Sequence, residues 1–433
     1  MATDRRKFLK QATQLGALSI LPFSGFAKNN TPEIDFSSFD FTKINTDDEQ
    51  FWKMLRLQFP LHTEKIYLNN GTMGPSPYPV IEAVNQKMLQ VDTTGEYGGW
   101  EESRKTIAKF VNATEDEICL THNVTEGINI IAQGLELKKG DEILLTNHEH
   151  VGGALPWLHR AKVQDLKVDY FVIGKTADQT MANLKSKITK KTKVIAVPHI
   201  VCTIGQIQPI KEIVELAKKQ NIELFVDGAH GMGMLNLDLH DLGCDYYATC
   251  CHKWLCGPKG TGFLYVKKEA LDKLQARYVG AGSDTGWSVI EPPTPVLKGY
   301  ATTAHRFDYG TQNASIWAGV NAAIKFFDTI TMAVVEERVK YLSTYLQNEL
   351  LKLKNDNIEL LTSTEPKSRG GVTAFKLKNM DFTKLQTEAT NAGFRVRAVA
   401  ENNVNCIRIS THIYNSPEEI NKFVKFVEEM AMK

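Results

Sequence analysis

The chain has 433 residues, 42% of them hydrophobic, which is enough for a large buried core and for two or three domains. The 51 lysines and arginines balance 50 acidic residues. The net charge of +1, without a basic tract interleaved with aromatic residues, gives no reason to expect a nucleic-acid partner. A small-molecule enzyme fits this composition.

The first thirty residues differ from the rest. Arg5-Arg6-Lys7 precedes a weakly apolar run at 15–23 and the small residue Ala27, a pattern that resembles a twin-arginine export signal. The run is too short to anchor the chain in a bilayer. We therefore expect residues 1–30 to be a signal peptide and the mature protein to be periplasmic and free of the membrane. If the paired arginines are only a basic N-terminus, the protein stays cytoplasmic.

Seven cysteines occur along the chain, with no zinc-type pairing. An odd count that includes the adjacent pair Cys250-Cys251 argues against a disulfide framework. We expect most of them to be small core residues.

Short apolar runs alternate with helical stretches between residues 115 and 266. This alternation predicts a mainly parallel sheet covered on both faces. Ligands bind such sheets at the carboxyl ends of the strands. The predicted strands are residues 142–146, 169–173, 194–200, 224–226, 246–249 and 262–266, and residues 209–220 are a predicted helix.

The C-terminal third reads as a smaller α+β domain. Residues 283–302 are rich in Gly, Pro and Thr and predict a loop, and a long helical region from 316 to 353 follows as a linker. Residues 371–377, 393–399 and 406–410 are predicted strands, and Ser416-Pro417-Glu418-Glu419 opens a closing helix with a capping box. We divide the chain into residues 31–75, an N-terminal segment packing on the small domain, 76–310, the large domain, and 311–433, the linking helix and small domain.

Lys253 and Asp227 are the most informative pair. Lys253 follows a predicted strand within Cys251-His252-Lys253-Trp254, and Asp227 ends another predicted strand. Pyridoxal phosphate needs a lysine that forms a Schiff base with its aldehyde and a carboxylate that keeps its ring nitrogen protonated. A solvated lysine and an unrelated strand-end aspartate are the alternative.

Three further segments suit the same ligand. Thr125 stands at the start of a predicted helix, where backbone N–H groups bind phosphate, although Asn123 or Thr125 could simply cap that helix. His150, at the end of a predicted strand, could stack on a flat ring, and with His148 it could instead bind a metal. Arg408 could bind a substrate carboxylate or form a structural salt bridge.

The order of these segments resembles the class V aminotransferase family, which uses pyridoxal phosphate and includes cysteine desulfurases, selenocysteine lyases, kynureninases and isopenicillin N epimerases. The resemblance runs from about residue 66 to the C-terminus. It is most specific in Asp227-Gly228-Ala229-His230 and His252-Lys253-Trp254. The segment 67–75 and the His-Lys-Trp tripeptide are most similar to the isopenicillin N epimerase branch.

The resemblance implies a fold type I enzyme, with a seven-stranded sheet in the large domain, and it implies site residues. Lys253, Asp227 and His150 would be catalytic: Lys253 would carry the cofactor and move the Cα proton, Asp227 would pair with the ring nitrogen, and His150 would stack on the ring. Further cofactor contacts would be Val124, Thr125, Ala229, His230, Cys250, His252 and Thr311. Thr311 would reach the phosphate of a neighbouring subunit, so a homodimer with shared active sites is implied. Asn70 and Arg408 would bind the amino-acid substrate.

Departures from the family limit the reaction. Cysteine desulfurases carry a nucleophilic cysteine where this chain has residues 396–403, without a cysteine, so we expect no desulfurase. Cys202 stands where relatives often carry a polar group near the ring. We expect an epimerase-like enzyme or an aminotransferase acting at Cα of an amino acid, with a β-elimination lyase as the alternative. Arg397 or Arg306 could meet a second substrate carboxylate. A non-catalytic exported binding protein and a metal-dependent hydrolase built on His148 and His150 are alternatives of other classes.

Overall fold

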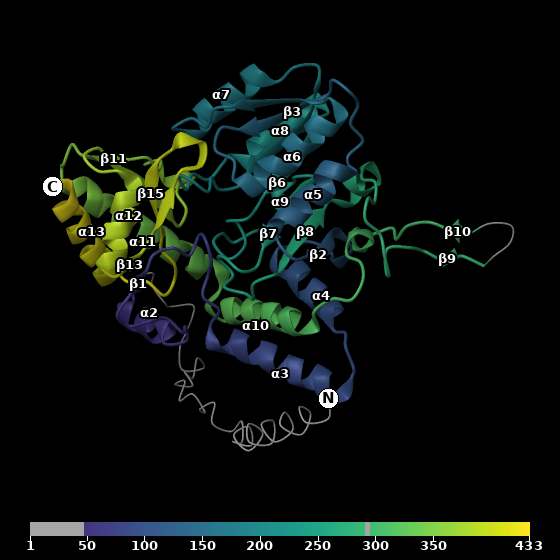
Figure 1. The fold of residues 1–433 in the computed structure, drawn as a ribbon, viewed down its shortest axis with the longest axis horizontal. Coiled ribbons are helices and arrows are strands. Elements are labelled where there is room, and N and C mark those ends of the chain that lie inside the picture. Colours follow the sequence, from purple (N-terminus) through teal and green to yellow (C-terminus); the bar gives the residue numbers. More distant parts are fainter. Residues whose placement is uncertain (1–46, 291–294) are drawn as a thin grey trace, which may run out of the picture. The chain divides into compact units, whose positions relative to one another are not determined.

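The computed structural model describes residues 47–290 and 295–433 (Figure 1). The export signal predicted for residues 1–30 lies outside these residues. All of the described residues belong to one compact unit. The boundaries proposed at residues 75 and 310 stay a prediction.

A seven-stranded sheet forms the centre of the fold, in the order β2-β8-β7-β6-β5-β3-β4. Neighbouring strands run parallel from β7 to β4, while β8 is antiparallel to both β7 and β2. The predicted mainly parallel sheet is therefore confirmed. Its strands are β2 (Ile118–Thr121), β3 (Glu142–Thr146), β4 (Lys167–Phe171), β5 (Thr192–Pro198), β6 (Glu223–Asp227), β7 (Tyr246–Cys250) and β8 (Gly262–Val266).

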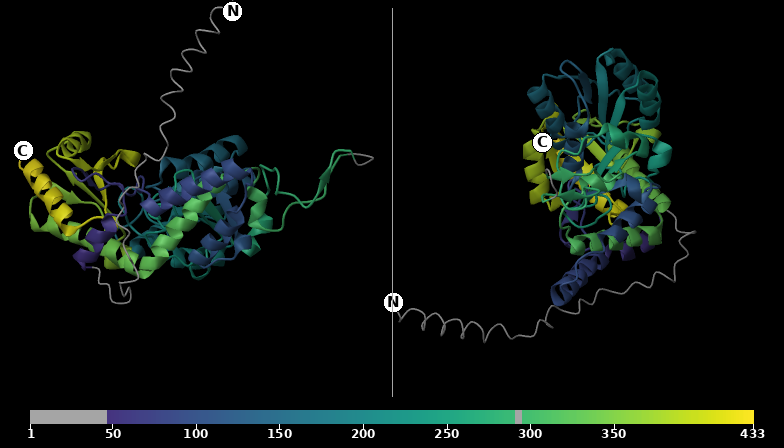
Figure 2. Two further views of the ribbon diagram at one scale, coloured as in Figure 1. Left: turned by 90° about the horizontal axis from the view of Figure 1, so that it is seen from below. Right: turned by 90° about the vertical axis from the view of Figure 1, so that its right-hand side faces the viewer.

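The central strands are mostly apolar because helices cover both faces of the sheet (Figures 1 and 2). Every residue of β7 and β8 is buried. The helices of this part are α3 (Tyr78–Thr94), α4 (Trp100–Phe110), α5 (Val124–Gly134), α6 (Val151–Gln164), α7 (Ala177–Lys187), α8 (Ile210–Gln220) and the short α9 (Leu239–Leu242). Because β3, β5, β6 and β7 run parallel, their carboxyl ends lie at the same edge of the sheet.

A second, four-stranded antiparallel sheet has the order β11-β12-β15-β14. It confirms the predicted α+β C-terminal part. Its strands are β11 (Ile358–Leu360), β12 (Val372–Leu377), β14 (Arg397–Val399) and β15 (Cys406–Ser410), with helices α12 (Phe382–Asn391) and α13 (Pro417–Ala431). Ser416 and Glu419 form the predicted capping box of α13.

The N-terminal segment joins this part of the fold. Helix α2 (Glu49–Arg56) is followed by β1 (Ile66–Tyr67), which pairs in parallel with β13 (Phe394–Arg395). A further bridge joins Asn69 to Ser410 in β15. The residues directly after β1 are thereby held next to the last strand of the small sheet.

Three predicted segments differ in the structure. The strand predicted at 393–399 is two strands, β13 and β14, which belong to different sheets. The long helical region is two helices, α10 (Ala314–Ile330) and α11 (Met332–Lys352), bent by 80°. The break falls at Thr331, which has a φ of +72°, a conformation that a β-branched residue cannot adopt within a helix. Residues 283–302 are not only a loop, because β9 (Trp287–Ser288) and β10 (Val296–Leu297) pair as an antiparallel hairpin.

Within the described residues, no single helix is long and apolar enough to cross a membrane. The bent pair α10 and α11 meets that criterion only when the two helices are taken together.

Candidate active site

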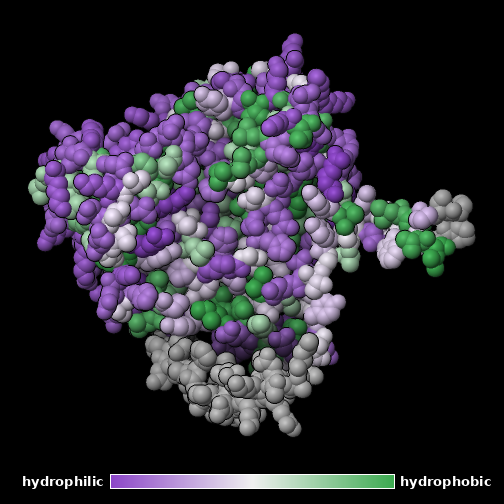
Figure 3. Space-filling model, in the orientation of Figure 1, coloured by the Kyte–Doolittle hydropathy of each residue, from purple (hydrophilic) through white to green (hydrophobic). Residues whose placement is uncertain are grey.

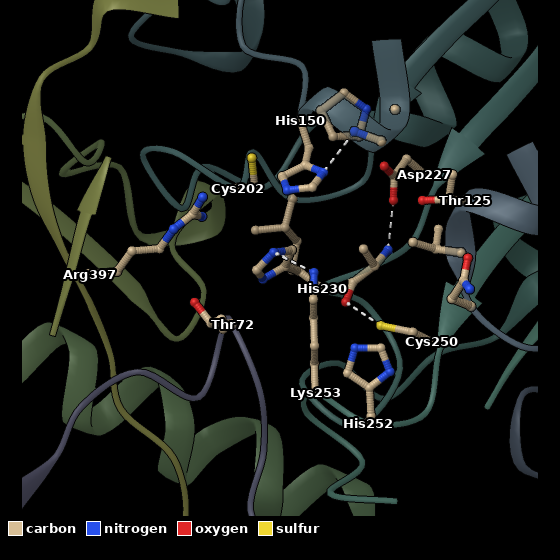
Figure 4. A pocket seen from close by; sticks show the side chains of 18 of the residues that line it. Thr72, Thr125, His150, Cys202, Asp227, His230, Cys250, His252, Lys253 and Arg397 are labelled. Carbon is tan, nitrogen blue, oxygen red and sulfur yellow. Dashed lines mark hydrogen bonds between the residues drawn. The ribbon is translucent and has the colours of Figure 1, made fainter. Parts of the chain in front are cut away.

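A cavity of about 300 Å³ lies at the carboxyl ends of the parallel strands (Figure 4). It receives side chains from the large sheet, from the small sheet and from the segment after β1. Ten of the twelve residues predicted for the site line it: Val124, Thr125, His150, Asp227, Ala229, His230, Cys250, His252, Lys253 and Arg408. The other lining residues are Gly71, Thr72, Asn123, Gly152, Gly153, Pro198, Ile200, Cys202 and Arg397.

Hydrogen bonds fix the backbone of Lys253. Its carbonyl oxygen accepts hydrogen bonds from the Asn70 amide at 3.4 Å and from the Cys256 N–H at 3.3 Å. A Cβ at Gly74 would lie 2.0 Å from the same oxygen, so only glycine permits this approach. The side chain of Lys253 is left to extend into the cavity (Figure 4).

Asn70 does not line the cavity. It is fully buried, donates to the Lys253 backbone and accepts from the Tyr414 hydroxyl at 3.0 Å. Its place in the structure is thus beneath the lysine loop, where it supports Lys253. Thr311 is exposed on the loop before α10, and its predicted contact with the phosphate of a neighbouring subunit stays a prediction.

Asp227 ends β6 with its carboxylate buried. One oxygen accepts the Ala229 N–H at 2.9 Å, and a Cβ at Gly153 would lie 3.2 Å from the other. Burial raises the pKa of this carboxyl group. No ion pair joins it to a lysine, arginine or histidine of the described residues, although the charge of Lys253 lowers its pKa to a smaller extent than burial raises it. A protonated ring nitrogen is the partner that such a carboxylate needs.

A second buried carboxyl group, Glu149, was missed in the sequence. It accepts hydrogen bonds from the Thr146 hydroxyl at 2.6 Å and the Thr146 N–H at 3.1 Å. The same Cβ at Gly153 would lie 3.2 Å from it, so Glu149 and Asp227 flank one glycine. Burial raises the pKa of Glu149 to about 8, and the charge of Asp227 adds to this effect. Glu149 is therefore largely protonated near neutral pH.

His150 caps α6, and its ring lies at the cavity (Figure 4). Its Nδ1 accepts the Gly152 N–H at 3.1 Å, which places the proton of the neutral ring on Nε2. Burial, followed by the charge of Lys253, lowers the pKa of His150 to about 4. A Cβ at Gly152 would lie 2.7 Å from the Thr125 hydroxyl, so the glycine lets α6 approach α5. A neutral, flat imidazole at this position suits stacking on an aromatic ring.

His230 is fixed by Trp254. The indole N–H of Trp254 donates to Nδ1 of His230 at 3.1 Å, and Nε2 of His230 lies 3.5 Å from Nζ of Lys253. Burial and the charge of Lys253 hold the pKa of His230 well below its ordinary value. The neutral ring then directs its Nε2–H toward the lysine side of the cavity.

The start of α5 supplies the predicted phosphate cradle. Asn123 caps this helix by accepting the Glu126 N–H at 3.0 Å, and first-turn N–H groups have no partner within a helix. Val124, Thr125 and His252 line the cavity at this end. Nδ1 of His252 is buried and has no hydrogen-bond partner among the described residues. These features fit an anionic phosphate, and with Lys253 and Asp227 the residues present fit pyridoxal phosphate.

Arg408 is a buried cation without a carboxylate partner among the described residues. It is 1% exposed and donates to the Cys202 carbonyl at 2.9 Å and to the Thr72 hydroxyl at 2.8 Å. Its Nε is buried without a partner in the part of the chain that the structure describes. Burial lowers the pKa of Arg408 to about 10, and the nearby charge of Arg397 acts in the same direction. An uncompensated buried guanidinium favours an incoming carboxylate over a structural salt bridge.

The other arginine considered in the sequence, Arg306, lies elsewhere. It donates to the Ala301 carbonyl at 2.7 Å and lies 3.9 Å from Asp272. Of the two candidates for a second substrate carboxylate, only Arg397 lines the cavity.

All seven cysteines are buried, as the sequence led us to expect for most of them. Cys202 and Cys250 line the cavity. Burial raises the pKa of Cys202 to about 11, so it is a thiol near neutral pH. The cysteine-free segment 396–403 contains strand β14, and its Asn402 amide donates to the carbonyl of Glu149, after β3, at 3.0 Å.

His148 makes a hydrogen bond that does not involve His150. Its Nδ1 lies 2.8 Å from the Thr203 hydroxyl, whereas His150 bonds to Gly152. Across residues 47–290 and 295–433, no group of three metal-ligating side chains is found.

Comparison with known proteins identifies the family. Residues 82–423 match the family described as aminotransferase class-V. The chain is 30% identical to a probable cysteine desulfurase of Borreliella burgdorferi, over 90% of this chain and 100% of that protein. It is 26% identical to the isopenicillin N epimerase of Amycolatopsis lactamdurans, over 88% of this chain and 98% of the epimerase.

Solved structures agree with this result. The cystine C–S lyase C-DES in complex with its reaction product, cysteine persulfide, superposes with a TM-score of 0.79 at 27% identity, covering 86% of this chain and 99% of the lyase. A C-DES mutant with glycine covalently linked to the pyridoxal-phosphate cofactor gives the same TM-score and identity. Together with the family match and the residues that line the cavity, these likenesses show that the chain belongs to the class V aminotransferase family of pyridoxal-phosphate-dependent enzymes.

Proposed function

We propose that this enzyme is a lyase that eliminates a substituent from Cβ of an amino acid, with Lys253 as its single general base. The strongest support for this proposal is that the ionisable side chains around Lys253 keep their protons and cannot act as bases. His150 and His230 each use Nδ1 as an acceptor and hold a proton on Nε2. Cys202 holds its proton because burial raises its pKa to about 11. Lys253 is left as the group that can take a proton from Cα.

The bound cofactor supplies an electron sink for the bonds at Cα. Arg408 binds the substrate carboxylate, and Thr72 keeps the guanidinium in place. The amine of Lys253 accepts the Cα proton. The Cα–Cβ bond becomes double as the Cβ substituent leaves with its bonding electron pair. The released enamine then hydrolyses in water to a 2-keto acid and ammonium.

Transfer of sulfur to the protein is not supported. A desulfurase needs a reactive thiolate as acceptor, but all seven cysteines are buried and the segment 396–403 carries none. A sulfur-containing leaving group would therefore be released as a product. The likeness to a cystine C–S lyase at 27% identity supports this kind of reaction.

Epimerisation at Cα is the second candidate, which the 26% identity to an isopenicillin N epimerase favours. It needs a proton donor on the side of Cα opposite Lys253. Cys202 could fill that role, because it lines the cavity and its raised pKa of about 11 keeps the thiol protonated as a donor. The variant Cys202→Ser separates the two reactions: we expect elimination to continue and epimerisation to be lost.

The test incubates the holoenzyme with L-cystine, β-chloro-L-alanine and a panel of other L-amino acids, without an added keto acid. We expect 2-keto acid and ammonium in equal amounts from substrates with a leaving group on Cβ, while the cofactor spectrum returns to its starting form. Accumulation of the D-amino acid without ammonium would identify an epimerase. Lasting conversion of the cofactor to its pyridoxamine form would identify an aminotransferase.

We also propose that the enzyme works as a homodimer. Strands β9 and β10 extend away from the rest of the described residues (Figures 1 and 2). Apolar side chains gather on this hairpin (Figure 3), and Trp287, Val289 and Ile290 are at least 66% exposed. An exposed apolar arm of this kind favours association with another copy. Size-exclusion chromatography with light scattering should give twice the chain mass, and Trp287→Asp should shift the protein toward monomer.

A further inference from the structure

Arg397 and Arg408 form a pair of like charges across two strands. In the small sheet β14 is antiparallel to β15, and Arg397 stands directly opposite Arg408. Residues opposite each other in this way point to the same face, with Cβ atoms about 4.5–5.5 Å apart. Both side chains line the cavity. Two like charges directly opposite each other destabilise a sheet, and an anion bound between them would relieve this repulsion.

The described residues compensate these charges only in part. Glu401 forms an ion pair with Arg397, and both side chains are partly exposed, at 20% and 24%. Glu401 itself does not line the cavity. Arg408 has no carboxylate partner among the described residues, so its guanidinium is available to bind the α-carboxylate of the substrate. After that carboxylate binds, the guanidinium of Arg397 still faces the cavity.

We propose that Arg397 binds a second anionic group, a carboxylate at the end of the substrate side chain. This inference rests on the proposed function, because it assumes an amino-acid substrate held by Arg408. The enzyme would then select amino acids with a short acidic side chain or an acidic substituent on Cβ. Glu401 holds Arg397 in the free enzyme and is displaced by the substrate carboxylate.

The test measures binding and does not depend on which bond breaks. L-Glutamate and L-glutamine are nearly isosteric and differ in one charge. Their dissociation constants are obtained from the change in the absorption spectrum of the holoenzyme. We compare the native protein with Arg397→Gln, Arg397→Lys and the control Arg395→Gln, which removes one positive charge from an exposed residue outside the cavity.

We expect the native enzyme to bind glutamate more tightly than glutamine. Arg397→Gln should weaken glutamate binding at least tenfold and glutamine binding less than threefold. Arg397→Lys should restore part of the preference, and Arg395→Gln should leave both constants unchanged. Equal weakening of both ligands in Arg397→Gln would overturn the proposal, because it would show that the two arginines clamp one α-carboxylate. An unchanged preference would overturn it as well.

Failure of this inference and failure of the proposed function give different results. If the enzyme is not a lyase, the product assay yields no equal amounts of keto acid and ammonium, while the binding preference for glutamate can still be measured. If Arg397 has no role in selection, the preference is absent or insensitive to Arg397→Gln, while the lyase products still form.

Discussion

Nε2 of His230 lies 3.5 Å from Nζ of Lys253. Trp254 donates to the other ring nitrogen, so the imidazole presents an N–H group toward the lysine. A neutral donor at this distance can orient the amine without competing with it for the Cα proton. His230, held by Trp254, therefore positions the Lys253 amine that moves the Cα proton.

Replacing His230 tests that link. His230→Gln keeps an N–H donor beside Lys253, whereas His230→Leu removes it. We expect kcat of the leucine variant to fall at least about tenfold below that of the glutamine variant, as for a lost buried hydrogen bond of about 1.4 kcal/mol. Steady-state kinetics with both variants decide this point. Equal kcat values would show that the donor has no role.

Replacing Lys253 with alanine should remove the catalytic base. We expect the rate on the true substrate to fall by about 10³-fold or more. Lys193→Ala, at an exposed position on β5, is the matched control and should keep full activity. Full activity of Lys253→Ala would show that the mechanism proposed here is wrong.

Arg408→Gln should separate substrate binding from stability. Removal of the charged contact should raise KM about 10- to 100-fold, because hydrogen bonds to charged groups contribute about 1.5–3 kcal/mol. The same change removes a buried charge that lacks a carboxylate partner in the described residues, so the free energy of unfolding should not decrease. Kinetics and urea unfolding together test this. A loss of about 3–5 kcal/mol in stability would indicate a structural ion pair instead.

Glu149 predicts a pH dependence of stability. Its pKa is raised from 4.5 to about 8 in the folded protein, so the folded state binds more protons than the unfolded state between these values. Its contribution is complete below pH 4.5 and is lost as the pH rises through 8, with a slope of up to about 1.4 kcal/mol per pH unit.

Glu149→Gln cannot ionise and should remove this part of the dependence. Urea unfolding at pH 5.5, 7 and 8.5 should show the native protein losing stability relative to the variant as the pH rises. Parallel curves for the two proteins would show that Glu149 is not protonated in the fold.

The sequence was sufficient to predict the central sheet because most of its strands are buried on both faces. Each of the six predicted strands overlaps a strand of the structure, and 142–146 and 262–266 coincide with β3 and β8. Strand β2 was not predicted. The break at Thr331 and the hairpin of β9 and β10 were missed too, because single backbone torsions and short pairings leave no periodic pattern.

The site residues that follow strand ends were accessible from the sequence, since the ends of parallel strands meet at one edge. The burial depth of each side chain and the register of the paired strands could not be predicted from the sequence. Asn70 was expected at the substrate, but burial beneath Lys253 depends on how the segment after β1 packs. Glu149 looked like an ordinary polar neighbour of two histidines. The pairing of Arg397 with Arg408 follows from the register of β14 on β15, which no local motif encodes.

The central claim is that Lys253 alone handles the Cα proton. The most direct measurement is the exchange of the Cα hydrogen of L-alanine, which has no leaving group, in D2O with the holoenzyme, followed by NMR and chiral chromatography. The account predicts that deuterium enters at Cα while the product stays L-alanine, because a single base returns the proton to the same face. Formation of D-alanine at a rate comparable to the exchange would contradict it and would show a second proton donor across the cavity.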